Sequence, residues 1–212
     1  RFEETEFVMT TSWMTYTPPG LGSTFHNHNN SMWSGVFYFG NEESKNTGIR
    51  FGDFQNKMNG FTLDPSIGEY CLSHPNIKTP DTGEYYAVNQ SNYAFFPEHT
   101  RRYIDWLVNE KRKGLRYIGS MVGDMHRTLL KGGIFMYPST SNAPQGKLRL
   151  LYECIPMSFL MQQAGGRASD GHQEIMDIIP EDLHQRSPIY IGSTRLLRRV
   201  DQFVEKYHTV DS

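Results

Sequence analysis

The hydrophobic positions in the second half of the chain repeat every three or four residues, the spacing of helices that pack one face on a core. The clearest repeat lies near the C-terminus and consists of Leu196, Leu197, Val200, Phe203, Val204 and Tyr207. An earlier repeat, expected to be mostly core, stops at two glycines and consists of Ile118, Met121, Val122, Met125 and Leu129. The pattern also predicts helices over residues 100–111 and 156–164, the second opening at a proline, which suits the first helical position.

Between these repeats lie short apolar runs that are typical of strands. The run Ile134–Pro138 is too short for a helix and is predicted to be a buried strand. Further strands are predicted within residues 61–64, 70–73, 175–179 and 188–191. Strands that alternate with helices predict an α/β fold made of layered sheet and helices.

The first 56 residues differ in composition from the rest of the chain. They contain three basic and six acidic residues, whereas the remainder contains 18 and 17. Aromatic and β-branched residues are concentrated in Val8–Thr17 and Gly35–Phe39, with a Pro-Pro-Gly turn signal between them. We therefore predict a short antiparallel β segment over residues 1–56, followed by a separate domain over residues 57–212.

Charge and cysteine content exclude several classes of function. A net charge of −2 and an isoelectric point near 6.5 give no reason to expect nucleic acid or a membrane surface as a partner. The two cysteines, Cys71 and Cys154, lack metal-binding spacing and favour a reducing compartment, so a cytoplasmic protein is expected. No apolar run reaches about 20 residues and no signal leader is visible, so no membrane span is expected.

Charged and apolar side chains alternate along much of the segment Gly146–Glu153, a pattern typical of a strand. On a strand, Lys147, Arg149, Leu151 and Glu153 would share one face, and Leu148, Leu150 and Tyr152 would share the other. Two cations two residues apart suit an anionic ligand. Glu153 would lie about 20 Å beyond Lys147 at ~3.3 Å per residue, too far to pair with it. A metal site at Glu153 and an ordinary salt-bridged, half-exposed strand both remain open.

Long blocks of the second half resemble class I fructose-1,6-bisphosphatase, specifically its sugar-binding C-terminal half. They read GFTLDPSIGEY from residue 60, RYIGSMVGDMHRTLLKGGIFMYPST from 116, GKLRLLYECIPMSFLMQQAGGRASDG from 146 and DIIPEDLHQRSPIYIGS from 177. The resemblance covers about residues 57–212. It implies the C-terminal part of the sugar phosphatase fold and a hydrolase of carbohydrate metabolism (gluconeogenesis) that converts fructose 1,6-bisphosphate to fructose 6-phosphate.

The same resemblance implies a set of site residues. Those that would bind a sugar bisphosphate or monophosphate are Asn89, Tyr93, Arg116, Tyr117, Met121, Tyr137, Lys147 and Arg149. In the family the arginine at position 116 reaches into a neighbouring subunit, which implies a homo-oligomer. Of the acidic ligands for Mg²⁺, only Glu153 is present, and Asp64 lacks the second aspartate of the family's metal loop. We therefore expect the isolated chain to be poorly active, or to be a non-catalytic sugar-phosphate-binding module.

A pair of histidines, His26 and His28, marks the first segment. The surrounding residues 12–39 (SWMTYTPPGLGSTFHNHNNSMWSGVFYF) resemble phage and bacterial iron(II)/2-oxoglutarate-dependent oxygenases of the double-stranded β-helix type. On a strand both imidazoles could bind one Fe(II), but the acidic ligand and the distal histidine of that family are not found. A surface pair of histidines, an oxygenase that uses 2-oxoglutarate, and an artificial fusion of two fragments remain as alternatives.

Overall fold

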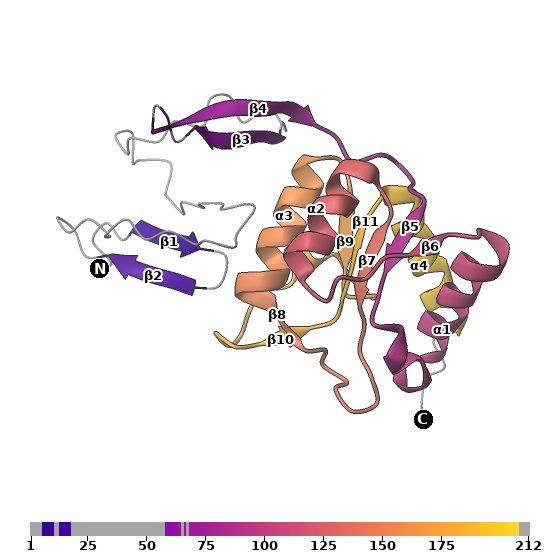
Figure 1. Ribbon diagram of the computed structural model, residues 1–212. Coiled ribbons are helices and arrows are strands. Elements are labelled where there is room, and N and C mark those ends of the chain that lie inside the picture. The colour runs from indigo at the N-terminus through magenta and orange to yellow at the C-terminus, as the bar shows by residue number, and fades with distance from the viewer. Residues whose placement is uncertain (1–5, 11–12, 18–57, 65, 67, 208–212) are drawn as a thin grey trace. The chain divides into compact units, whose positions relative to one another are not determined.

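The computed structural model describes residues 6–10, 13–17, 58–64, 66 and 68–207 (Figure 1). The chain divides into two compact units, Arg1–Phe54 and Gln55–Ser212. In the first unit, strands β1 (Glu6–Thr10) and β2 (Trp13–Thr17) form an antiparallel hairpin in which Glu6 pairs with Thr17. The predicted antiparallel β-structure is therefore present there, whereas Gly35–Phe39, His26 and His28 lie outside the described residues.

The second unit is built on a mixed five-stranded sheet with the order β6-β5-β7-β11-β9. Its strands are β5 (Tyr85–Ala87), β6 (Gly114–Leu115), β7 (Ile134–Tyr137), β9 (Arg167–Ser169) and β11 (Ile189–Gly192). Strand β5 runs parallel to both β6 and β7, while β11 runs antiparallel to β7 and β9. Because β5 and β7 are parallel neighbours, their carboxyl ends lie at the same edge of the sheet.

Helices cover both faces of this sheet (Figure 1). Helices α2 (Met121–Lys131) and α3 (Ile155–Gln163) lie on one face, and α1 (Glu98–Asp105) and α4 (Thr194–Tyr207) lie on the other. Strand β7 separates the two cores, since Phe135 joins the core under α2 and α3, whereas Ile134 and Met136 join the core under α1 and α4. This is the layered α/β architecture that the alternation of helices and strands predicts.

Four predicted helices and the buried strand at β7 are confirmed, with two adjustments. Helix α1 continues into a π-helical turn, η2 (Trp106–Glu110), so the predicted segment 100–111 is helical but not uniformly α-helical. The first member of the predicted repeat, Ile118, precedes α2 and is 64% exposed. The helix therefore begins only at Met121, and the other members of the repeat are buried or partly buried.

Two predicted strands take a different form. Ile175–Asp177 is a 3₁₀ turn, η4, in which Ile175 is buried. The predicted strand Gly146–Glu153 is extended only at β8 (Leu148–Arg149), which pairs with β10 (Arg186–Ser187). It then becomes a π-helical turn, η3 (Leu150–Cys154), that leads into α3. Leu150 and Cys154, four residues apart, are both buried, so helical spacing prevails over the alternation seen in the sequence.

The remaining element of this unit is an antiparallel hairpin of β3 (Met58–Asp64) and β4 (Glu69–Ile77), which confirms the strands predicted there. Most of β4 is exposed, and only its last residue, Ile77, is buried. None of the helices in the part of the chain described by the structure is long and apolar enough to cross a membrane.

Candidate anion-binding site

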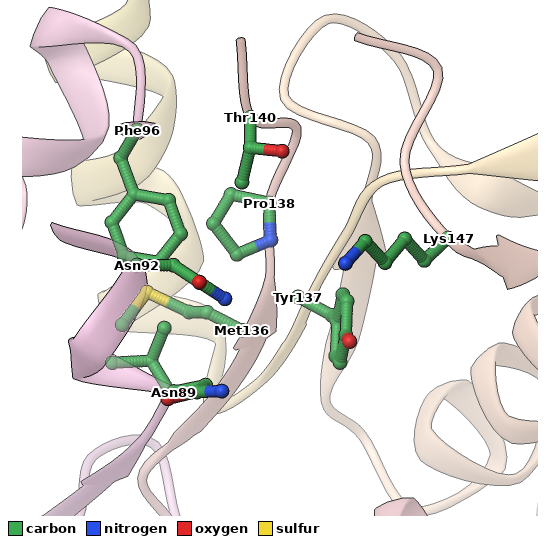
Figure 2. A pocket seen from close by; sticks show the side chains of 9 residues that line it. Asn89, Asn92, Phe96, Met136, Tyr137, Pro138, Thr140 and Lys147 are labelled. Atoms are coloured by element: carbon green, nitrogen blue, oxygen red, sulfur yellow. The ribbon is translucent and has the colours of Figure 1, made fainter. Parts of the chain in front are cut away.

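A pocket lies at the edge of the sheet where β5 and β7 end (Figure 2). It is shallow, and its empty space of about 280 Å³ includes space open to solvent. Its lining residues are Val88, Asn89, Asn92, Phe96, Met136, Tyr137, Pro138, Thr140 and Lys147. Three of the predicted site residues, Asn89, Tyr137 and Lys147, therefore share one pocket. An apolar base with a few polar groups around it is the usual form of a small-molecule site.

Asn89 stands at the start of the 3₁₀ helix η1 (Gln90–Phe95), and its amide has two distinct ends. Its Oδ1 accepts hydrogen bonds from the backbone N–H of Ser91 at 3.2 Å and from the Ser91 hydroxyl at 2.6 Å. Because the oxygen caps the helix, the Nδ2 amino group is the end that remains to face a ligand. An amide that presents its N–H groups suits an anion.

Lys147 approaches the pocket from the side opposite Asn89 and Asn92, with the Tyr137 ring near the end of its side chain (Figure 2). The loop before it is held by hydrogen bonds between Thr140 and Ala143 and by the Gly146 N–H, which donates to the Ala143 carbonyl at 3.0 Å. Gly146 has a φ of +75°, and a Cβ there would meet the backbone of Ser187 and Pro188. The glycine thus lets the loop pass close to that backbone and brings Lys147 to the pocket.

Two further lining residues, Asn92 and Thr140, carry polar side chains that sequence reasoning did not select. Asn92 belongs to η1, and its backbone N–H donates to the Asn89 carbonyl at 3.1 Å, which places the two amides on one wall (Figure 2). Thr140 follows β7 at the turn that leads towards Lys147. Turn-forming residues of this kind are common, so nothing in the sequence distinguished them as ligands.

Arg116, Tyr117 and Met121 lie next to the start of α2 and do not line the pocket itself. Tyr117 and Met121 are partly buried against the same core cluster as Tyr137. Burial raises the pKa of the Tyr117 phenol, and the nearby Tyr137 and Asp124 raise it further. The Arg116 side chain is exposed, and its guanidinium lies 5.1 Å from the centre of the Tyr85 ring.

Tyr93 does not line the pocket. Its hydroxyl donates to the Asp105 carboxylate at 2.7 Å, which links η1 to helix α1. Burial is the main cause of its raised pKa, and the hydrogen bond to Asp105 adds to it. In this arrangement Tyr93 supports the wall that carries Asn89 and Asn92 rather than lining the pocket.

Arg149 and Glu153 form a local pair. Because η3 is helical, the Glu153 carboxylate turns back, accepts the backbone N–H of Arg149 at 2.6 Å and lies 4.0 Å from the Arg149 guanidinium. The expectation that Glu153 stands far along an extended strand is therefore wrong, because the chain coils after Arg149. Both side chains are partly exposed, at 42% for Arg149 and 33% for Glu153.

Glu153 does not by itself provide a magnesium site. Within the described ranges, no three His, Cys, Asp or Glu side chains come together as a group that could hold a metal ion. Mg²⁺ requires near-octahedral oxygen coordination and releases its waters reluctantly, so one carboxylate already engaged with Arg149 does not fit it. A metal site at Glu153 would therefore need several further ligands.

Comparison with known proteins gives the family of this domain. The family description "Fructose-1-6-bisphosphatase, C-terminal domain" matches residues 79–205. The class 1 fructose-1,6-bisphosphatase of Cytophaga hutchinsonii is 53% identical over 153 residues, which cover 70% of this chain and 44% of that protein. The second class 1 enzyme of Salinibacter ruber is 53% identical over 156 residues, which cover 71% of this chain and 43% of that protein.

Solved structures agree with this assignment. The fructose-1,6-bisphosphatase of Leishmania major in its T-state superimposes with a TM-score of 0.69 at 46% identity and covers 72% of this chain and 48% of that one. Its apo form gives a TM-score of 0.69 at 47% identity. The chain thus spans slightly less than half the length of its relatives, and none of these matches supports the oxygenase alternative. The chain belongs to the fructose-1,6-bisphosphatase family, whose C-terminal domain it carries.

Proposed function

We propose that this domain binds the phosphate group of a phosphorylated sugar in the pocket at the ends of β5 and β7. The proposal rests on the charge and hydrogen-bonding character of the side chains that line this pocket. Asn89 and Asn92 bring amides, Lys147 brings an ammonium group, and none of the described residues that line the pocket carries a carboxylate. Such a set favours an anion over a cation or a neutral sugar.

The individual contacts divide into orienting and charge-bearing groups. The Asn89 amide is fixed by its bonds to Ser91, so little side-chain entropy remains to be lost when a ligand binds. Lys147 supplies the positive charge, and a charge-assisted hydrogen bond from it would contribute about 1.5–3 kcal/mol if desolvated. The other predicted residues, Tyr117, Met121 and Arg149, would contact the sugar or its phosphate from the α2 and η3 side.

The activity of the whole protein is part of this proposal. By its family the full protein would hydrolyse fructose 1,6-bisphosphate to fructose 6-phosphate with Mg²⁺, and Glu153 would be one of several metal ligands. The bound metal would polarise the phosphate and activate a water. Arg116, whose side chain is exposed, would complete the phosphate site of an identical neighbouring subunit. A cytoplasmic location agrees with two free cysteines.

Calorimetric titration of fructose 6-phosphate into the full chain tests the proposal. Lys147→Ala should weaken binding by at least tenfold, which corresponds to about 1.4 kcal/mol. Lys131→Ala is the matched control, because Lys131 is an exposed lysine at the end of α2, outside the pocket lining. Fructose without phosphate should not compete. If the wild-type chain and Lys147→Ala bind equally, or if neither binds, the assigned site is wrong.

A further inference from the structure

Asp124, in the first turn of α2, is a fully buried carboxylate next to the candidate residue Tyr117. Its Oδ2 accepts a hydrogen bond from the backbone N–H of Ile118 at 3.0 Å, and its Oδ1 accepts one from Nη2 of Arg127 at 2.7 Å. A buried carboxylate is tolerated only when it is paired and hydrogen-bonded, and these contacts meet that need. Its position near the positive N-terminal end of α2 stabilises the carboxylate further.

Arg127 extends the arrangement to the other side of Tyr117. The same Nη2 donates to the backbone carbonyl of Arg116 at 2.9 Å. The carbonyl before Tyr117 and the N–H after it are thus both held by one ion pair, the Asp124–Arg127 clamp. Fixing the two flanking peptide groups limits the backbone angles of Tyr117 and therefore the direction of its side chain.

The held tyrosine is the one that stands beside the pocket. Tyr117 is partly buried against the core cluster that Tyr137 also borders, and Tyr137 lines the pocket. A tyrosine phenol is protonated at neutral pH, and burial raises the pKa of Tyr117 above its ordinary value of 10.0. A neutral phenol in a fixed position can donate a hydrogen bond to a phosphate or sugar oxygen.

We infer that Asp124 and Arg127 are positioning residues of the sugar-phosphate site, which hold the Arg116–Ile118 backbone so that the Tyr117 hydroxyl is presented beside Tyr137. The inference rests on the proposed function, since Tyr117 acts as a ligand only there. Neither Asp124 nor Arg127 lines the pocket, so both act through Tyr117. Preorganisation of this kind lowers the entropic cost of binding.

A double-mutant cycle separates positioning from general support of the fold. Asp124→Asn should weaken fructose 6-phosphate binding about tenfold in the wild-type background, the loss expected for one misplaced hydrogen bond. In a Tyr117→Phe background, where the hydroxyl is absent, the same substitution should change binding less than about twofold. Equal losses in both backgrounds would reduce the clamp to a structural role. Asp201→Asn, which breaks the 2.9 Å pair with Arg167 away from the pocket, is the control and should leave binding unchanged.

A second readout does not depend on the ligand. Hydrogen exchange at the Ile118 amide should accelerate at least tenfold in Asp124→Asn and should stay slow in Asp201→Asn. If Asp124→Asn does not fold, Arg127→Gln, at a residue 21% exposed, replaces it in both experiments. Unchanged exchange would overturn the clamp. If the wild type and Asp124→Asn bind fructose 6-phosphate with equal affinity, only the positioning role is overturned. If the wild type does not bind it, the proposed function is overturned, and with it the role of Tyr117.

Discussion

Asn89 shows how one side chain can serve both the fold and a ligand. Its oxygen caps η1 through Ser91, which leaves its amino group to face the pocket. Glu153 shows the opposite case, because its carboxylate caps the N–H of Arg149 and is thereby drawn into local structure. The chemistry available at each residue is thus set by which of its atoms the backbone has already engaged.

This division predicts an unusual result for Asn89→Asp. A carboxylate keeps the oxygen that accepts from Ser91, and Asp and Asn are equally good capping residues, so the free energy of unfolding should change by less than about 0.5 kcal/mol. The second oxygen, however, would place negative charge where the phosphate binds. Calorimetry with fructose 6-phosphate should therefore show a loss of at least tenfold. Asn109→Asp, an exposed site in η2, is the control; equal affinity in the two variants would refute the assignment of Asn89.

At the scale of elements, the pattern of apolar residues predicted the helices and several strands but failed on the shortest strands and on η3. The four helices and β7 were predicted because each carries several apolar positions. Strands β6 and β10 have only two residues each, too few for any alternation to be visible. The turn η3 was misread because a run of apolar and charged residues fits a strand as well as a helix until the burial of Leu150 and Cys154 is known.

Prediction of the site residues was limited in a similar way. Lys147 was indicated both by the paired cations of residues 146–153 and by family resemblance, whereas Asn89 and Tyr137 were indicated by resemblance alone, since they lie on separate elements and no local pattern joins them. The role of Asp124 was not visible in the sequence, because its burial, its contact with the Ile118 N–H and its pairing with the Arg127 side chain depend on tertiary structure. Sequence therefore supplied ligand types, and the fold supplied their grouping.

The loop that carries Lys147 should be intolerant of a side chain at Gly146. In Gly146→Ala, the new Cβ would stand 2.6 Å from the Ser187 carbonyl oxygen at a positive φ, so backbone must move. Gly165→Ala is a matched control, with φ +85° but nothing within 4 Å. Strain alone should cost Gly165→Ala about 1–2 kcal/mol. Urea denaturation should show a larger loss in the free energy of unfolding for Gly146→Ala than for Gly165→Ala, and only Gly146→Ala should lose fructose 6-phosphate binding. Equal losses of stability in the two variants would contradict the close approach.

At the scale of the whole domain, several buried or partly buried tyrosines have raised pKa values. Burial is the main cause of the raised pKa in five of them: Tyr86, Tyr93, Tyr103, Tyr117 and Tyr190. Tyr190 also shares a hydrogen bond of 2.6 Å with the Thr100 hydroxyl, which links β11 to α1. Folding therefore favours the protonated phenol at several positions at once.

Stability should consequently fall at alkaline pH. A phenol whose folded pKa is raised contributes fully below its unfolded value near 10, and this contribution is lost as the pH rises through the folded pKa. Urea denaturation between about pH 8 and pH 11 should show a decline that begins near pH 10. Tyr190→Phe should make the decline shallower, whereas Tyr70→Phe, at a side chain 67% exposed, should not. A free energy of unfolding that stays constant to pH 11 would refute this.

Binding and hydrolysis can be separated in one measurement, phosphorus NMR of fructose 1,6-bisphosphate mixed with this 212-residue chain and Mg²⁺. Binding energy from a remote phosphate positions a substrate but does not replace the metal-bound nucleophile. We predict that one phosphate resonance broadens in the wild type and not in Lys147→Ala, while inorganic phosphate stays near background in the wild type and in Glu153→Gln. The contrary result is inorganic phosphate released at about 1–10³ s⁻¹, the range of ordinary enzymes, and abolished by Glu153→Gln. It would require carboxylates from outside the described residues, with Glu42, Glu43 and Asp53 the first to test; unchanged resonances would contradict the phosphate site itself.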